Sequence, residues 1–224
     1  MPTELIDRTF AAVIFDMDGT LIDSTPAVLR AWTQWAIDER VPAAALTGFH
    51  GVPAEGVVAA VLPAERQAEA LERINRLELT DTEGIVPLPG AIDAFDRLPV
   101  DRVAIATSCT APLAEARLTA SGLRWPKVLV TVDDVEHGKP APDPYLAAAE
   151  RLGFDPADCL VVEDAPKGLQ SARAAGAATL AVITTSPRSE LQADLVVENL
   201  AAVGWETDPT SGEIRLIRHV GAGA

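Results

Sequence analysis

The sequence predicts an α/β protein, with a doubly wound, mostly parallel sheet as its core and an inserted all-helical cap domain. Short apolar runs rich in valine and isoleucine alternate with helical patterns in the second half of the chain, as in buried parallel strands. A long block with helical patterns only separates the first such run from the second. The length of 224 residues suits one core domain that carries a smaller insert.

The composition narrows the possible partners. With 48% hydrophobic but only 4% aromatic residues, the core must consist mainly of alanine, valine, leucine and isoleucine. The chain has 18 basic and 33 acidic residues, a net charge of −15, which repels nucleic acids and anionic membranes. We expect neither as a partner, and we expect a monomer or weak dimer. A phosphate site on such a surface must supply its own positive charge.

Two features point to a cytoplasmic protein. Cys109 and Cys159 lie in or beside apolar, strand-like runs, which predicts buried thiols in the reduced state. The first residues lack the basic stretch and apolar segment of a signal peptide, and no apolar run approaches the length of a membrane span.

The first predicted strand, residues 11–14, runs into two acids. Asp16 and Asp18 follow it and precede Gly19 and Thr20, at the edge where α/β sheets bind ligands. In an extended segment both carboxylates point the same way, so they repel unless a cation such as Mg²⁺ or a shared proton lies between them. By itself this DxD pattern is more typical of a solvated turn.

The longer string FDMDGTLIDS, residues 15–24, resembles the first motif of the haloacid dehalogenase superfamily. In that superfamily DxDGT opens Mg²⁺-dependent phosphatases and mutases. The match covers ten contiguous residues and is highly specific, so it favours a functional reading over a solvated turn.

The helical block predicts a cap at residues 23–87, inserted between core segments 1–22 and 88–224. A serine, a threonine and a proline at residues 24–26 are typical of a helix start, and Trp32 and Trp35 recur at helical spacing as core residues. The pattern stays helical to about Pro87, where a Pro-Leu-Pro-Gly run predicts the return hinge.

Two cap residues are candidates for substrate binding. His50 lies in a loop between two predicted helices, where a histidine is usually just exposed, and the resemblance implies that it reads the leaving group of the substrate. Glu78, near the end of the cap with Asp81 and Thr82, is a weaker candidate, because a helix that ends in a polar turn explains it equally well.

The second half of the chain alternates strands and helices. Strands are predicted at 102–107, 127–132, 159–162, 179–183 and 194–197, with helices at 112–120, 144–152 and 167–175 and a terminal hairpin within 204–220. Thr107 and Ser108 end the second strand, where hydroxyl and backbone N–H groups can donate to phosphate. They resemble the second motif of the superfamily, which implies that Thr107 donates to the substrate and that Ser108 lies beside it.

The two remaining motifs supply a cation and a second acidic pair. Lys139 lies in GKPAPDPY, whose prolines stiffen the loop; an isolated lysine is usually a solvated charge, but this string resembles the third motif. Glu163 and Asp164 end the strand at 159–162 within VVEDAPKG, which resembles the fourth motif and implies a completed magnesium site.

The resemblance implies a mechanism. Asp16 would attack phosphorus to form an aspartyl-phosphate, and Asp18 would protonate the leaving oxygen and later deprotonate water. Mg²⁺ would be held by the Asp16 carboxylate, the Asp18 backbone carbonyl and Asp164, with Glu163 as a supporting acid. Its charge, with Lys139 and Thr107, would offset charge on the phosphoryl group.

Among superfamily members, the sequence looks most like glycerol-3-phosphate and 2-deoxyglucose-6-phosphate phosphatases, which implies a small phosphorylated sugar or polyol as substrate. The nearest alternative is a β-phosphoglucomutase-like enzyme. Where such mutases have an arginine and a histidine, this chain has Ala54 and Val28, so we expect no site for a second phosphate and no restraint on Asp18, although Arg30 or Arg66 could substitute. A dehalogenase would not be expected to keep Asp18, and a non-catalytic binding protein would have lost a motif residue.

Overall fold

The computed structural model describes residues 5–6, 8–47 and 52–218. Their core is a six-stranded sheet in the order β6-β5-β2-β7-β8-β9, and every neighbouring pair is parallel. The strands are β2 (Ala12–Phe15), β5 (Val103–Ala106), β6 (Val128–Val130), β7 (Cys159–Glu163), β8 (Ala178–Val182) and β9 (Leu195–Val197). These are the six strands predicted for the core, and the doubly wound α/β class is confirmed.

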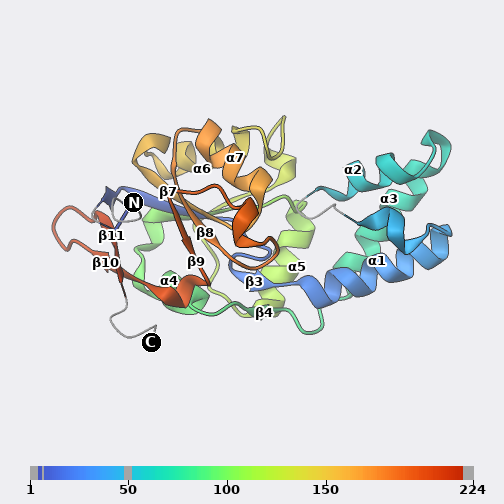
Figure 1. The fold of residues 1–224 in the computed structure, drawn as a ribbon, viewed down its shortest axis with the longest axis horizontal. Helices are drawn as coiled ribbons and strands as arrows, with labels where there is room; N and C mark the ends of the chain where they lie inside the picture. Colours follow the sequence, from blue (N-terminus) through green and yellow to red (C-terminus); the bar gives the residue numbers. More distant parts are fainter. Residues whose placement is uncertain (1–4, 7, 48–51, 219–224) are drawn as a thin grey trace.

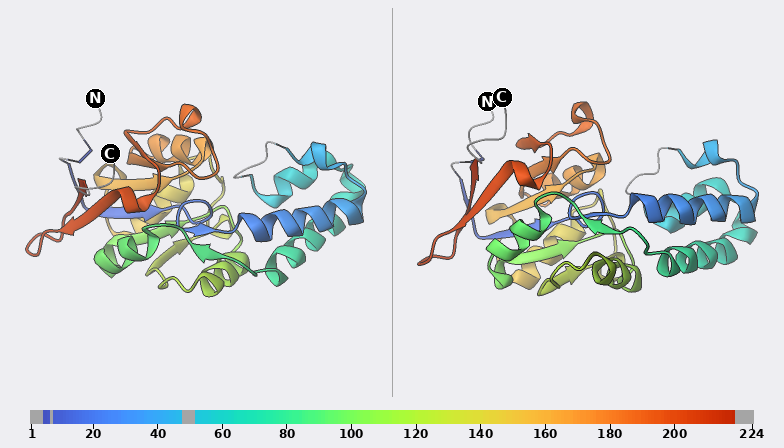
Figure 2. Two further views of the ribbon diagram at one scale, coloured as in Figure 1. Left: turned by 60° about the horizontal axis from the view of Figure 1, so that its bottom comes forward. Right: turned by 90° about the horizontal axis from the view of Figure 1, so that it is seen from below.

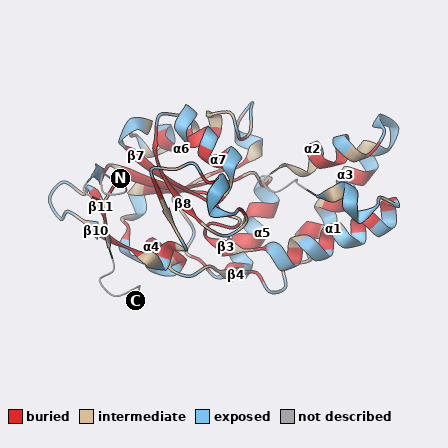
Figure 3. Ribbon diagram, in the orientation of Figure 1, coloured by how far each residue is buried: buried red, intermediate tan, exposed pale blue. Residues whose placement is uncertain are grey.

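Helices cover both faces of this sheet. They are α4 (Ala91–Arg97), α5 (Ala111–Ser121), α6 (Asp143–Leu152) and α7 (Pro166–Ala174). Helices α4 and α5 cover one face, and α6 and α7 cover the other (Figure 1). Val13 and Phe15 pack with the first pair of helices, whereas Ala12 and Ile14 pack with the second pair. Successive residues of a strand face opposite sides, so a strand buried on both faces needs the continuous apolar run seen in the sequence (Figure 3).

A three-helix unit lies at one end of the molecule, beside the core (Figures 1 and 2). It consists of α1 (Thr25–Glu39), α2 (Ala54–Val61) and α3 (Ala64–Thr80). Trp35 is fully buried in a separate apolar cluster of this unit, and Trp32 packs at its edge, as predicted for both. The unit therefore has a small core of its own.

A short antiparallel pair, β3 (Ile22–Asp23) and β4 (Val86–Pro87), connects the unit to the core. The prediction of a helical pattern as far as Pro87 is wrong at this point, because α3 ends at Thr80 and residues 86–87 form a strand. Two residues are too few to give a strand periodicity, and the pairing partner lies more than 60 positions away along the sequence.

A second sheet lies at the end opposite the three-helix unit (Figure 2). Its order is β1 (Thr9–Phe10), β11 (Ile214–Arg218) and β10 (Val203–Thr207), all antiparallel. The predicted terminal hairpin is β10–β11, and the ring of Trp205 meets that of Phe15 edge-on, with 5.9 Å between centroids. The hairpin thus covers one side of the core.

Short 3₁₀ segments join several elements, at Ala43–Leu46, Val100–Arg102, Val132–Asp134, Pro156–Asp158, Arg188–Glu190 and Leu200–Ala202. Both cysteines are free and buried. None of the helices in the described ranges is long and apolar enough to cross a membrane.

Candidate active site

The carboxyl ends of three neighbouring strands bring the predicted core residues together. Asp16 directly follows β2, Thr107 directly follows β5, and Glu163 with Asp164 ends β7. Because β5, β2 and β7 are adjacent and parallel, their ends meet at one edge of the sheet. Asp16, Thr107, Glu163 and Asp164 are all buried there.

Lys139 connects these strand ends. Its ammonium donates to Asp16 Oδ1 at 2.5 Å, to Glu163 Oε1 at 2.8 Å and to the carbonyl oxygen of Ala106 at 3.0 Å. It also lies 5.0 Å from the centroid of the Tyr145 ring. The two carboxylates raise its pKa against the opposing effect of burial, so the ammonium stays charged. The loop around Lys139 therefore supplies the positive charge beside Asp16 that a phosphate site in this acidic chain requires.

Glu163 has a donor for every acceptor position of its carboxylate. Oε1 accepts from Lys139 and, at 2.8 Å, from the hydroxyl of Tyr145; Oε2 accepts from the backbone N–H of Asp164 and Ala165, at 2.9 and 3.0 Å. A Cβ on Gly168 would overlap this carboxylate, so helix α7 approaches it closely only because residue 168 is glycine. Glu163 thus orients its neighbours, which fits a supporting acid better than a direct metal ligand.

Asp16 and Asp164 remain available to a cation. Among the described residues, no donor reaches Oδ2 of Asp16. Asp164 accepts from Thr185 and, at 3.4 Å, from Thr20. One carboxylate oxygen from each of Asp16, Asp164 and Glu163 lies within 4.8 Å of the others.

The chemistry of these groups fits a hard divalent cation. Burial raises the pKa of Asp16, with Glu163 and Asp164 adding to the rise and Lys139 opposing it. Burial and the charge of Glu163 raise the pKa of Asp164 to about 7. Gly19 has φ +84°, and a Cβ there would overlap Asp164 Oδ2, so glycine leaves space beside this oxygen. Anionic oxygens that repel one another in a buried site are suitable ligands for Mg²⁺.

Asp18 is held by donors from three other parts of the chain. Its Oδ1 accepts from Ser24 Oγ at 2.5 Å and from Arg117 Nη1 at 2.9 Å, and its Oδ2 accepts from Cys109 Sγ at 3.1 Å. The expectation that nothing restrains Asp18 is therefore wrong. That expectation rested on Val28 and named only Arg30 or Arg66 as possible substitutes. The donors are instead Ser24 just before α1, Cys109 just before α5 and Arg117 on α5.

Arg117 is the residue that sequence reasoning missed. It is 5% exposed on α5 and joins Asp18 to Glu78, whose Oε1 accepts from Nη2 at 3.0 Å. Glu78 is buried in the last turn of α3, and burial raises its pKa although Arg117 opposes the rise. The sequence did indicate this residue, because it places an arginine among the apolar positions of a predicted helix. A buried arginine needs an anionic partner.

The other predicted residues divide into two groups. Thr107 accepts at Oγ1 from the N–H of Cys109 at 3.2 Å, and its own hydroxyl hydrogen can donate; Ser108 is half-buried next to it. His50 lies outside the described residues. The structure thus gathers the predicted core residues, and it places Glu78 beside Arg117 at the boundary between the three-helix unit and the core.

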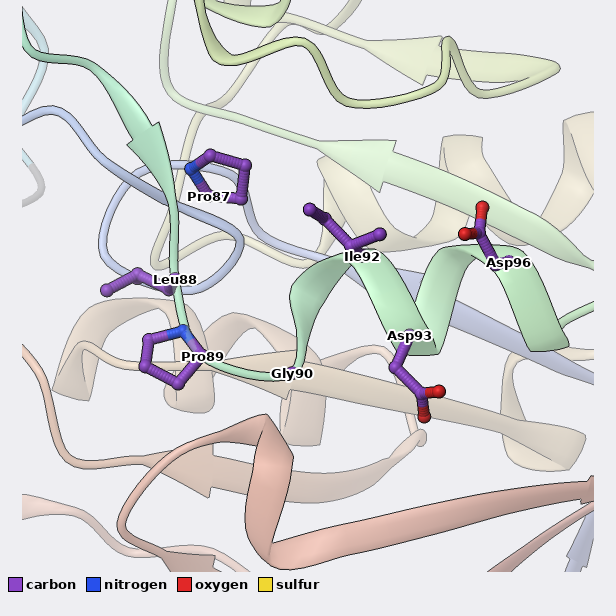
Figure 4. Close-up of a pocket in the computed structure, with 7 residues that line it drawn as sticks. All are labelled: Pro87, Leu88, Pro89, Gly90, Ile92, Asp93 and Asp96. Atoms are coloured by element: carbon purple, nitrogen blue, oxygen red, sulfur yellow. The ribbon is translucent and has the colours of Figure 1, made fainter.

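A surface hollow of about 510 Å³ lies at the return hinge (Figure 4). It is lined by Pro87, Leu88, Pro89, Gly90, Ile92, Asp93 and Asp96. None of the predicted site residues lines it. The candidate site is therefore the sheet edge around Asp16. It is identified by the chemistry of its side chains and not by the size of a cavity.

Curated relatives share nearly the whole chain. Hexitol phosphatase A of Escherichia coli is 39% identical over 208 residues, covering 90% of this chain and 96% of the relative. Glycerol-1-phosphate phosphohydrolase 2 of Saccharomyces cerevisiae is 32% identical over 215 residues, covering 89% and 86%. Both alignments extend through the core and the three-helix unit.

Solved structures agree on the fold. A hydrolase from Pseudomonas syringae is 31% identical with a TM-score of 0.70, covering 85% of this chain and 94% of that one. A putative β-phosphoglucomutase from Thermotoga maritima is 28% identical with a TM-score of 0.64, covering 84% and 94%. A family model described as haloacid dehalogenase-like hydrolase matches residues 10–176, which include the acids, Thr107 and Lys139. The chain therefore belongs to the haloacid dehalogenase-like hydrolase family.

Proposed function

We propose that this hydrolase is a Mg²⁺-dependent phosphatase that cleaves small sugar or polyol phosphate monoesters through an aspartyl-phosphate. The observation that carries the proposal is the buried group of Asp16, Lys139 and Asp164, in which Lys139 holds one oxygen of Asp16 and no described residue donates to the other. Such a group can present a carboxylate to a phosphate and offset the charge of both. The phosphatase names of the relatives support the substrate class.

Asp16 acts first. Lys139 fixes Oδ1, so Oδ2 attacks phosphorus in line with the departing ester oxygen. The new bond joins Oδ2 to phosphorus, and the broken P–O bond leaves its electron pair on the ester oxygen. Lys139 and the hydroxyl of Thr107 offset the charge on the phosphoryl oxygens.

Asp18 moves the protons. It gives a proton to the ester oxygen as this leaves, and it then takes one from the water that attacks the aspartyl-phosphate. That second attack releases inorganic phosphate and restores the carboxylate of Asp16. A residue with one carboxylate oxygen anchored and one weakly bonded, as Asp18 is, suits both transfers.

Mg²⁺ would be held by Asp16, Asp164 and the backbone carbonyl of Asp18. Glu163 would orient this group through its hydrogen bonds with Lys139 and the backbone N–H of Asp164. The bound ion supplies positive charge that lets an anionic nucleophile approach a phosphate dianion. We further propose that residues 23–87 act as a cap domain on a core of residues 1–22 and 88–224, and that this cap excludes bulk water and selects the leaving group.

The ion pairs of Arg30 and Arg66 favour hydrolysis over phosphate migration. A mutase has to bind a bisphosphate, so its cap needs a free cation for the second phosphate. Arg30 is bound to both carboxylate oxygens of Asp81, at 2.7 and 2.6 Å, and Arg66 is bound to Glu39 at 2.6 Å. Both arginines that could replace the missing mutase residue already have a partner within the three-helix unit.

A phosphate-release screen tests the proposal. The protein is incubated with hexitol, hexose and glycerol phosphates, with and without Mg²⁺, and we expect release that requires the metal. A second assay supplies β-glucose 1-phosphate with a trace of the 1,6-bisphosphate. Free phosphate should form faster than glucose 6-phosphate, and the reverse order would establish the mutase instead.

A further inference from the structure

A buried arginine joins the three-helix unit to the loop that carries Asp18. Arg117 donates from Nη1 to Asp18 Oδ1 and from Nη2 to Glu78 Oε1. Asp18 follows β2 of the core, whereas Glu78 belongs to α3, which packs against α5. Burying the charges of Arg117 and Glu78 costs desolvation free energy, and apolar residues of similar volume often stabilise a protein as well or better. Stability alone therefore does not account for this arrangement.

The bridge makes the two oxygens of Asp18 unequal. Oδ1 has two strong donors, Ser24 and Arg117, whereas Oδ2 has the thiol of Cys109, which is a weak donor. The Asp18 side chain is 26% exposed, so solvent or substrate can approach it. Anchoring one oxygen fixes the direction in which the other points.

We propose that Arg117 is a positioning residue that aims Asp18 Oδ2 at the water that hydrolyses the aspartyl-phosphate, and that Glu78 fixes Arg117 from the side of the three-helix unit. This inference rests on the proposed phosphatase function and adds two residues that lie outside its four motifs. In the step concerned, the water proton moves to Oδ2, the water oxygen bonds to phosphorus, and the bond from phosphorus to Asp16 breaks with its electrons returning to the carboxylate.

An aryl ester separates this step from the first one. p-Nitrophenolate leaves without a proton, so formation of the aspartyl-phosphate from p-nitrophenyl phosphate does not need Asp18 as an acid. The ratio kcat/KM covers only the steps up to the release of nitrophenolate, whereas kcat also includes hydrolysis of the phosphoenzyme. If Asp18 is no longer oriented toward the water, kcat must therefore fall while kcat/KM stays unchanged.

The test uses Arg117→Met and the double variant Arg117→Met with Glu78→Met. We expect kcat for p-nitrophenyl phosphate to fall by about 10- to 100-fold, because a small displacement of a catalytic group has effects of this size. The value of kcat/KM should stay within about threefold, and rapid mixing should show a burst of nitrophenolate as phosphoenzyme accumulates. Arg30→Met is the matched control, since it breaks the ion pair with Asp81 without touching Asp18, and it should change neither constant.

The double variant keeps the test valid if the single variant does not fold, because it removes one positive and one negative buried charge together. A double variant that recovers the melting temperature of the wild type but keeps the low kcat and the burst supports positioning. Equal falls of kcat and kcat/KM without a burst, or no change in either, would overturn it.

Glu78 is tested by a conservative pair. Glu78→Gln keeps an oxygen that accepts from Arg117, so it should lower kcat less than Glu78→Leu, which releases Arg117 and should show the burst. Equal behaviour of the two variants would remove Glu78 from the inference. A wild-type protein that releases no phosphate from any ester refutes the proposed function itself, whereas proportionate losses in variants of an active wild type refute only the positioning role.

Discussion

The two acids of the first motif are two residues apart but are held by different regions of the molecule. Asp16 belongs to the sheet edge, where Lys139 fixes it and Glu163 in turn fixes Lys139. Asp18 lies in the loop after β2, beside the contact between α3 and α5, where Arg117 on α5 links it to Glu78 on α3. The first set of partners comes from the core alone, and the second includes a helix of the three-helix unit.

This difference separates two parts of the chemistry. A displacement of α3 would leave the Asp16 network unchanged, because within the described ranges its hydrogen bonds join core residues only. The same displacement would move Glu78 and so loosen Arg117. In the proposed mechanism, attack on phosphorus therefore depends on the core, whereas proton transfer by Asp18 is also sensitive to the position of the three-helix unit.

Removal of the nucleophile should have the largest effect. Asp16→Asn keeps the volume but loses the attacking oxygen and a metal ligand, so we expect phosphate release to fall by at least about 1,000-fold while the protein stays folded. The measurement is steady-state phosphate release with a circular dichroism spectrum as the folding control. Activity within about tenfold of the wild type would contradict the role of Asp16.

Asp18→Asn should also be severe, by about 100- to 1,000-fold, because an amide neither donates a proton to the ester oxygen nor takes one from water. The comparison of the two regions also predicts that Asp18→Asn and Asp16→Asn differ in whether phosphoenzyme forms. The Asp18 variant should still form phosphoenzyme from an aryl phosphate, detectable by acid quench, whereas the Asp16 variant should form none. Phosphoenzyme in both variants, or in neither, would remove the distinction between the two acids.

Much of the sheet edge could be predicted from the sequence, and the reason is physical. A short apolar run precedes Asp16, Thr107 and Glu163, and the ends of adjacent parallel strands necessarily meet. Arg117 could not be predicted in this way, because its two carboxylate partners lie 99 and 39 positions away and its helix has no unusual spacing. The short pair β3–β4 escaped prediction for the same reason, since only the partner strand defines it.

Close packing at the sheet edge should make Gly168→Ala harmful. The added methyl group would overlap the carboxylate of Glu163, so we expect a loss of about 1–3 kcal/mol in the free energy of unfolding, together with reduced activity. Gly138→Ala is the control, because a Cβ at Gly138 meets no atom within 4 Å. Equal unfolding free energies in urea for the two variants would show that α7 can move away at little cost.

The acids of the sheet edge should couple metal binding to stability. The raised pKa of Asp164, about 7, means that its proton stabilises the metal-free folded state at acid pH and that this stability is lost as the pH rises through 7. Mg²⁺ should therefore raise Tm by more at about pH 8 than at about pH 6. Asp164→Asn should remove most of the effect of Mg²⁺ on Tm, and an unchanged effect would exclude Asp164 as a ligand.

The smallest effect is expected at His50, which is predicted to read the leaving group from the cap. A residue that donates one hydrogen bond to a sugar or polyol hydroxyl contributes about 2- to 10-fold to kcat/KM. His50→Ala should therefore lower kcat/KM for a hexitol or glycerol phosphate by that factor and leave p-nitrophenyl phosphate nearly unchanged, because the aryl group offers no hydroxyl. The burst that marks the loss of Arg117 should be absent, since hydrolysis of the phosphoenzyme occurs after the leaving group has gone. A loss shared equally by both esters, or by neither, would show that His50 does not read the substrate.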